Sequence, residues 1–444
     1  MINFEGYDFT DGGVCAPRGF VAGAAAAGIK TSLDNLPLNT ADVGGSPLKS
    51  ADSNGLPLKS ASGGSPLKND IAVIYALRPC VAAAVYTQNK VKGAPIIVTE
   101  RHLKDSKAQA IVANSGNANT CNANGIEIAE KVCEITAAEL NIKKEDVIVA
   151  STGVIGQPLT MTPFEEHLPA LCASLTEFGS LEACSAIMTT DTTKKQAAVE
   201  FTLNGKPCRI GGIAKGSGMI NPNMATMLCF ITTDVSINDE MLKLALSEAA
   251  NVTFNRVCVD GDTSTNDMAT IMASGAAGNV EIISENEDYE VFFGGLYAVM
   301  TNLAREMARD GEGATKLIEC LVVNAPDTLT AHVISKSVIS SSLVKTAIFA
   351  ADANWGRILC AIGYADAQFD IDKVSVDLIS QAGRIRVCEN GSGIEFSEGK
   401  AHNILLEDEI TIYIDVNSQG EGEAVAWGCD LSYDYIKINA EYRT

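Results

Sequence analysis

Histidine, the usual general base near neutral pH, is scarce in this sequence, which has only four in 444 residues. None of the four, His102, His167, His332 and His402, lies in a glycine-rich turn or beside a cluster of Ser, Cys or Asp, so we expect each to be structural. This scarcity disfavours Ser-His-Asp and Cys-His chemistry, although the members of a triad meet in space and need not be neighbours in sequence.

Positive charge is also in deficit, because 33 Lys and Arg face 55 Asp and Glu, which gives a formal net charge of -22. Phosphate binding needs clustered basic side chains, so we expect no nucleic-acid partner and no anionic membrane partner. No apolar run approaches the roughly 18–20 residues of a membrane helix. The first residues, MINFEGYDFTDGG, lack the basic and apolar regions of a signal peptide, so we expect a cytoplasmic protein.

Paired cysteines are missing as well. The 13 cysteines, from Cys15 to Cys429, are scattered singly, without a CxxC pair and without neighbouring histidines. That distribution argues against a zinc site and against the disulfide framework of a small secreted protein. We expect most of these cysteines to be small buried apolar residues.

Glycine-rich loops are present, but they lack the spacing of nucleotide or calcium loops. GGIAKGSG at 211 does not match G-x4-G-K-[ST], and no G-x-G-x-x-G follows a strand and opens a helix. DGDTSTNDMATI at 260 begins like a calcium loop, but Thr265 and Ile271 stand where glycine and glutamate are needed. We expect a hydrogen-bonded turn there, and a metal site at Asp260, Asp262 and Asp267 is the alternative.

Residues 31–68 differ in composition from the rest of the chain. They repeat Pro-Leu-Lys at Pro47, Pro57 and Pro66, spaced by Ser, Gly, Ala and Asp. The segment has too few large apolar side chains to fold alone, so we expect an inert surface insertion.

The remainder alternates strand-like and helix-like segments, which predicts an α/β (α+β) fold of mixed sheets layered with helices. Strands are predicted at AIVAN (110), VIVAS (147), AAVEFTL (197), TMLCFIT (226), VCVD (257), ATIMAS (269), CLVV (320), RIRVC (384), ITIYIDV (410) and AVAWG (424). Helices are predicted over 125–140, after a cap at Asn238, and over 296–307.

A tight loop runs directly into an apolar strand at KGSGMINPNMATMLCF, residues 215–230, with Ala225 and Thr226 at the junction. A threonine hydroxyl is a weak nucleophile, but the free amine of an N-terminal threonine can serve as its base. Cleavage between Ala225 and Thr226 would supply that amine. The alternative is that Thr226 is an ordinary β-branched strand residue.

The same segment resembles the self-cleavage site of the glutamate N-acetyltransferase/ornithine acetyltransferase (ArgJ-type) family of arginine biosynthesis. Further motifs follow in family order: GGVCAPRGFVAGAAAAGIK at 12, IVANSGNANTCN at 111, ASTGVIGQPL at 150, MTTDTTKK at 188, DGDTSTND at 260, RDGEGATK at 309, SLVKTAIFAADANWGRI at 342 and YIKINAEYRT at the C-terminus. The resemblance covers the chain except 31–68. It implies the DmpA/ArgJ-like fold and two chains, residues 1–225 and 226–444, the second beginning with the nucleophile Thr226.

The resemblance also implies roles for individual residues. Thr152 and Gly153 correspond to the oxyanion hole, a role that suits a hydroxyl or backbone donor beside a glycine. The implied substrate contacts are Thr152, Lys195, Thr226, Glu312, Asn439 and Thr444. In this set Lys195 can meet a carboxylate and Glu312 an ammonium group. Thr193-Lys194 replaces the usual Arg-Pro, which leaves Lys194 as an alternative to Lys195.

The implied reaction is ping-pong transfer of an acetyl group from N2-acetylornithine to glutamate through an acetyl-Thr226 ester. No metal or prosthetic group is implied, acetyl-CoA is a possible second donor, and the implied assembly is a heterotetramer of two copies of each chain. Two alternatives remain: an amidohydrolase or aminopeptidase of the same fold that gives the acyl group to water, and a non-catalytic amino-acid-binding protein.

Overall fold

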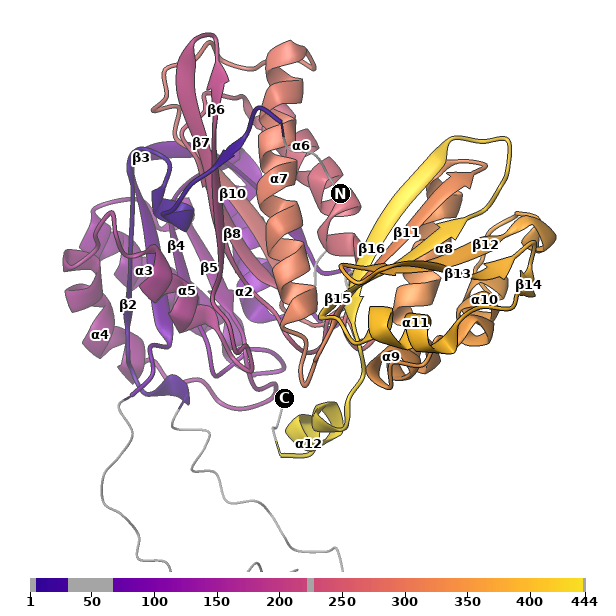
Figure 1. Cartoon of the computed structure of the whole chain (residues 1–444). Helices are drawn as coiled ribbons and strands as arrows, with labels where there is room; N and C mark the ends of the chain where they lie inside the picture. The colour runs from indigo at the N-terminus through magenta and orange to yellow at the C-terminus, as the bar shows by residue number, and fades with distance from the viewer. Residues whose placement is uncertain (1–4, 31–66, 222–226, 442–444) are drawn as a thin grey trace, which may run out of the picture.

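A computed structural model describes residues 5–30, 67–221 and 227–441 (Figure 1). Nearly all of the 31–68 insertion lies outside the described residues, as do Ala225, Thr226 and Thr444. The predictions made for them are therefore not addressed by the structure. Within the described residues no helix is long and apolar enough to cross a membrane.

The first of two sheets contains nine described strands, in the order β1-β6-β7-β8-β10-β3-β4-β5, with β2 paired to β3. Its strands are β1 Asp8–Phe9, β2 Phe20–Ala25, β3 Ile71–Tyr86, β4 Lys107–Asn114, β5 Val147–Ser151, β6 Lys195–Leu203, β7 Lys206–Lys215, β8 Leu228–Thr233 and β10 Met268–Ala273. β8 is antiparallel to β7 and parallel to β10. Residues 222–226 therefore connect two hydrogen-bonded neighbours near the middle of this sheet.

The second sheet has seven described strands, in the order β14-β13-β12-β15-β11-β16-β9. They are β9 Val257–Cys258, β11 Leu317–Ala325, β12 Ser375–Ser380, β13 Gly383–Glu389, β14 Ser392–Gly393, β15 Glu409–Asp415 and β16 Gly422–Cys429. Each sheet combines parallel and antiparallel pairs, so both are mixed.

The α-helices of the described residues are α2 Ala94–His102, α3 Gly125–Leu140, α4 Thr162–Ala173, α5 Ser180–Ile187, α6 Asp239–Val252, α7 Glu287–Arg309, α8 Thr328–Ser340, α9 Ser342–Phe349, α10 Trp355–Gly363, α11 Glu398–Leu405 and α12 Tyr433–Glu441. Figure 1 shows α6 and α7 between the first sheet and the second, with α8 to α11 beside the second sheet. The prediction of mixed sheets layered with helices is confirmed.

One large apolar core joins the two sheets through α6 and α7. Its members include Ile210 and Ile231 from the first sheet, Leu246 and Met300 from the helices, and Trp427 from the second sheet, all of them buried. Burying a side chain of this size stabilises a fold by roughly 1.5–3 kcal/mol. The core packs both sheets against α7, so the C-terminal ends of α7 and β7 belong to one packed unit.

Each of the ten predicted strand segments overlaps a strand, and the segments at 257, 269 and 410 run past the observed strand ends at Cys258, Ala273 and Asp415. The segment predicted from 226 matches β8 from Leu228 onward, and its first residue lies outside the described residues. The predicted helix over 125–140 has the bounds expected. Asn238 caps α6 by accepting a hydrogen bond from the Met241 N–H. The helix predicted over 296–307 is longer and begins at Glu287, because Asn286 provides an N-cap about two turns before the Gly294-Gly295 pair. Most of the cysteines are buried and all are free, while Cys121 and Cys360 are exposed.

Candidate active site

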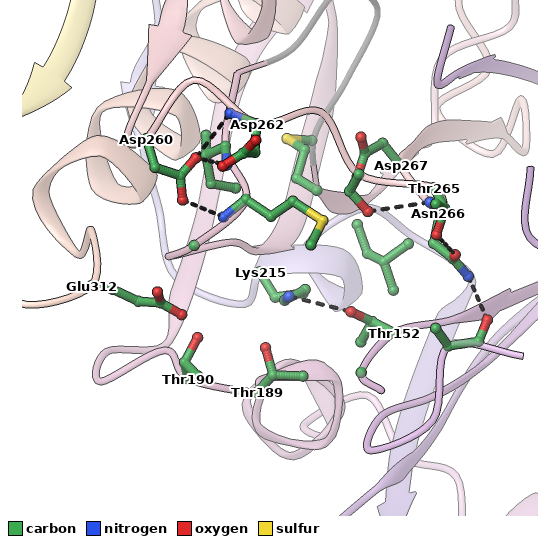
Figure 2. A pocket seen from close by; sticks show the side chains of 18 of the residues that line it. Thr152, Thr189, Thr190, Lys215, Asp260, Asp262, Thr265, Asn266, Asp267 and Glu312 are labelled. Atoms are coloured by element: carbon green, nitrogen blue, oxygen red, sulfur yellow. Dashed lines mark hydrogen bonds between the residues drawn. The ribbon is translucent and has the colours of Figure 1, made fainter. Parts of the chain in front are cut away.

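A pocket opens where β7 ends and β8 begins, and its wall comes from several elements far apart in the sequence (Figure 2). Its cavity volume is about 170 Å³, below the roughly 300–1,000 Å³ of sites for drug-sized ligands, so it suits a ligand the size of one amino acid. The polar groups facing it that matter most for chemistry are Thr152, Thr189, Thr190, Lys215, Glu312 and Asn439.

Thr152 and Gly153, the oxyanion hole implied by the resemblance, follow β5 and lie together in the pocket wall. The Thr152 N–H donates to the Asn114 carbonyl at 2.9 Å, so only its hydroxyl remains as a donor toward the pocket. The Gly153 N–H makes no hydrogen bond to another described residue. Gly153 has φ 127°, and a Cβ there would overlap the Gly116 carbonyl, so only glycine fits.

Lys195 begins β6 and does not line this pocket. Its side chain is fully buried, and its ammonium group donates to Asp191 Oδ1 at 2.7 Å and to the Asp310 carboxylate. Burial alone would lower the pKa of Lys195, but the two carboxylates outweigh it and raise that pKa above its ordinary value. Lys195 is therefore committed to an internal ion cluster. The alternative, Lys194, is exposed and does not line the pocket.

Lys215, the last residue of β7, is the lysine that lines the pocket. It is buried, and its Nζ lies 3.3 Å from the Thr152 hydroxyl oxygen, to which it donates. Figure 2 shows Lys215 between Thr152 and Glu312. A buried ammonium beside an oxyanion donor is placed to meet negative charge, either a substrate carboxylate or a developing oxyanion.

Glu312 and Asn439, two of the substrate contacts implied by the resemblance, both line the pocket and bond each other. Glu312 follows α7 and is buried, and its Oε2 accepts a hydrogen bond from Asn439 Nδ2 of α12 at 2.7 Å. A Cβ on Gly218 would overlap the Glu312 carboxylate, so the glycine allows this side chain to reach across the 216–219 loop. The carboxylate is placed to accept hydrogen bonds from a substrate ammonium group.

The predicted nucleophile, Thr226, lies outside the described residues, but the residues on both sides of its segment line the pocket. These are Met219 and Ile220 before it and Met227 and Leu228 after it. The chain on either side of Thr226 therefore borders the same cavity as Thr152, Gly153 and Lys215.

The loop over 260–267 is tied to the chain before residue 222, since the Asp260 carboxylate accepts from the backbone N–H of Met219 and Ile220, as well as from that of Asp262. Within the described parts of the chain no group of three or more His, Cys, Asp and Glu could hold a metal ion. Three of the histidines contact a backbone carbonyl through Nδ1: His102, His167 and His402.

Sequence reasoning missed Lys215, Thr189 and Thr190 as pocket residues. Thr190 Oγ1 lies 2.7 Å from the hydroxyl of Ser217, which ties the MTTDTTKK motif to the KGSG motif. Both motifs belong to the set that resembles the family, and Lys215 is the first residue of KGSG. Its position at the end of a strand that feeds the pocket is the signal that could have identified it.

Over residues 58–444 the chain matches the ArgJ family. It is 45% identical over 438 residues to an arginine biosynthesis bifunctional protein ArgJ from Caldanaerobacter subterraneus subsp. tengcongensis, an alignment that covers 98% of this chain and 100% of that protein. It is 48% identical over 378 residues to an arginine biosynthesis bifunctional protein ArgJ 1 from Clostridium acetobutylicum, covering 85% of this chain and 92% of that protein.

A solved structure of arginine biosynthesis bifunctional protein ArgJ from Bacillus halodurans shares 45% identity, with a TM-score of 0.47, and the match covers 49% of this chain and 100% of that one. The match to the family over most of the chain, together with relatives aligned nearly end to end, confirms the family predicted from the collinear motifs: the chain belongs to the ArgJ family.

Proposed function

We propose that this chain cuts itself before Thr226 and then transfers an acetyl group from N2-acetylornithine to glutamate through an ester on Thr226. Membership in the ArgJ family makes the chain an acyltransferase of arginine biosynthesis. It therefore favours transfer to an amino acid over hydrolysis by an amidohydrolase or aminopeptidase of the same fold.

In the first step the Thr226 hydroxyl attacks the Ala225 carbonyl carbon. The bond between that carbon and the Thr226 nitrogen breaks, and the hydroxyl proton passes to the nitrogen, which becomes an amine. Water then hydrolyses the ester, leaving a carboxylate on Ala225 and restoring the Thr226 hydroxyl. The chains 1–225 and 226–444 would stay together, because β7 and β8 are hydrogen-bonded neighbours in one sheet and lie on opposite sides of the cut.

In the second step the Thr226 hydroxyl takes the acetyl group from N2-acetylornithine and releases ornithine. The α-amine of glutamate then attacks the ester, and N-acetylglutamate leaves. The Thr226 amine, with an ordinary pKa of about 7.7–8.0, accepts and returns the proton in both halves. The oxyanion formed in each half would be held by the Thr152 hydroxyl and the Gly153 N–H, with the Lys215 charge beside them.

The observation that carries this proposal is the placement of opposite charges around one small pocket that contains the oxyanion donors. Lys215 bonds Thr152 on one side, and Glu312 with Asn439 forms the other. An amino acid with an ionised carboxylate and an ionised amine matches that arrangement. We assign the carboxylate contact to Lys215 in place of Lys195, whose ammonium group is occupied by Asp191 and Asp310.

The pocket needs no metal or prosthetic group for this chemistry, and acetyl-CoA is a candidate second donor. We also propose a heterotetramer of two copies of each chain and a cytoplasmic location. The Thr444 contact implied by the resemblance remains part of the proposal. Asn439, five residues before Thr444, reaches the pocket from α12.

The experiment is to incubate the purified protein with N-acetylornithine and glutamate, and separately with acetyl-CoA and glutamate, and to measure N-acetylglutamate. Formation from the first mixture supports the proposal. Release of acetate without N-acetylglutamate would indicate a hydrolase, and absence of both products would indicate a binding protein.

A further inference from the structure

The chain on both sides of residues 222–226 is held by one segment, 259–268. On the upstream side, the Val259 N–H donates to the Ile220 carbonyl at 2.7 Å, and the Thr263 hydroxyl donates to the Asn221 carbonyl at 2.9 Å. On the downstream side, the Met268 N–H donates to the Met227 carbonyl at 2.8 Å. The predicted scissile bond therefore lies between two anchor points on the same segment.

Asp260 supplies the charged group by which segment 259–268 holds the chain before residue 222. Its Oδ2 accepts from the Met219 N–H at 2.6 Å, and its Oδ1 accepts from the Ile220 N–H at 2.9 Å. Two consecutive backbone N–H groups that converge on one anion form a nest, and hydrogen bonds to a carboxylate are stronger than neutral ones. Figure 2 shows the Asp260 carboxylate with these contacts at the edge of the pocket.

Met219 has a left-handed backbone conformation, with φ 55°, which is unusual for a residue other than Gly, Asn or Asp. Such a conformation persists only where its surroundings impose it, and it is frequent next to reacting groups. The Asp260 carboxylate is the group that imposes it here, because the turn at Met219 is what aims two successive N–H groups at one point.

The C-terminal helix contributes to the same anchor. The Tyr435 hydroxyl of α12 donates to Asp260 Oδ2 at 3.3 Å. Burial and the nearby Asp260 raise the pKa of Tyr435, so its phenol keeps the proton that it donates. The helix that carries Asn439 to the pocket is thereby connected to the loop that precedes the cleavage site.

We propose that Asp260 is a positioning residue for self-cleavage: with Thr263, it fixes the path of residues 219–221, which lead directly into the predicted cleavage segment. This inference rests on the proposed function, of which self-cleavage is the first step. Asp260 takes no proton and forms no bond with the reacting atoms. Its contribution is orientation, and small misplacements of reacting groups cost roughly 100-fold in rate.

The test is the rate of cleavage of newly made chain, followed in cell-free synthesis by intact mass over time. Asp260→Asn keeps the size of the side chain but replaces one acceptor oxygen with a donor, so it cannot accept both N–H groups. We expect roughly 10- to 100-fold slower cleavage than in the wild type. Asp262→Asn is the matched control, since it removes the same charge two residues away and keeps the backbone N–H through which Asp262 donates to Asp260; it should cleave at the wild-type rate.

A second pair of variants separates positioning from folding. Thr263→Val removes the hydroxyl that bonds the Asn221 carbonyl and keeps the shape, whereas Thr263→Ser keeps the hydroxyl. We expect slow cleavage in the first and near wild-type cleavage in the second. Thermal unfolding of each change in an uncut Thr226→Ala background shows whether the precursor is folded at the temperature of the assay.

The outcomes decide separately on the two proposals. If the wild-type chain is never cut, both the proposed function and this inference are wrong. Wild-type cleavage together with an unchanged rate in Asp260→Asn, or an equal loss in Asp262→Asn, overturns the inference alone. If Asp260→Asn unfolds the precursor, the Thr263 pair decides, and equal rates in Thr263→Val and Thr263→Ser overturn it.

Discussion

The ammonium group of Lys215 donates a hydrogen bond to the hydroxyl oxygen of Thr152 over 3.3 Å, at the wall of the pocket. A hydroxyl that accepts from an ammonium group has its own proton free to donate elsewhere, and the neighbouring positive charge makes it a better donor. The two residues come from β7 and from the turn after β5, which are not neighbours in the sheet. Their meeting is the geometric basis of the predictions on catalysis.

We expect Lys215→Met to lower kcat/KM for acetyl transfer by about 10²- to 10³-fold, because it removes a charge from both the carboxylate contact and the oxyanion site. Steady-state kinetics with N-acetylornithine and glutamate measures this. Activity within twofold of the wild type would show that Lys215 does not act in the reaction.

The Thr152 hydroxyl is tested by Thr152→Val and Thr152→Ser. Valine keeps the shape without a donor and should lower kcat by about 10²- to 10³-fold, whereas serine keeps the donor and should retain most of the activity. Equal rates for the two variants would mean that the hydroxyl is not an oxyanion donor and that the Gly153 N–H acts without it.

Lys195 should be required for stability. Lys195→Met removes the ammonium group that bonds both Asp310 and Asp191, so Asp310 loses its ion pair and Asp191 keeps only the nearby charge of Lys215. Removing one partner of a buried ion pair costs about 3–5 kcal/mol. The matched control is Lys194→Met, an exposed neighbour, which should change the free energy of unfolding by less than about 0.5 kcal/mol. Denaturant unfolding of both proteins measures this, and similar stabilities would contradict the internal role of Lys195.

Acid should destabilise the protein in part through His332. Burial, followed by the charges of Arg256 and Lys336, lowers the pKa of His332 from 6.5 to about 4. Between these pH values the unfolded state binds a proton that the folded state does not, so stability falls as the pH drops from 6.5 toward 4. We expect His332→Gln to lose less stability over this range, in denaturant titrations at several pH values. Parallel curves for the two proteins would contradict this.

Local patterns predicted much of the fold. The apolar stripe of Gly125–Leu140 and the cap at Asn238 each indicated one helix correctly, because both signals lie within a few residues of sequence. The long strand Ile71–Tyr86 was not predicted, because Pro79 interrupts its apolar run; the pairing with β4 shifts register between Tyr75 and Cys80, and the strand continues beyond the irregularity.

The first half of α7 was missed for a different reason. Gly294 and Gly295 are poor helix formers, yet a Cβ at Gly294 would overlap the Tyr7 hydroxyl. The glycine is needed for a tertiary contact with a residue 287 positions earlier, and no local pattern reveals such a contact. The same limit applies to the choice between Lys195 and Lys215 as the pocket lysine. The two differ in which carboxylates surround them, and that difference depends on how the strands pair in the sheet.

The most direct test of the account is the mass of the fragment that begins at Thr226 after brief incubation with N-acetylornithine alone. We predict two fragments, 1–225 and 226–444, with the second heavier by one acetyl group and returned to its original mass when glutamate is added. Thr226→Ala should remain a single uncut chain that never gains the acetyl mass. A wild-type chain that stays at 46.6 kDa, or transfer of acetyl by the Thr226→Ala protein, would contradict the central claim that Thr226 is the nucleophile.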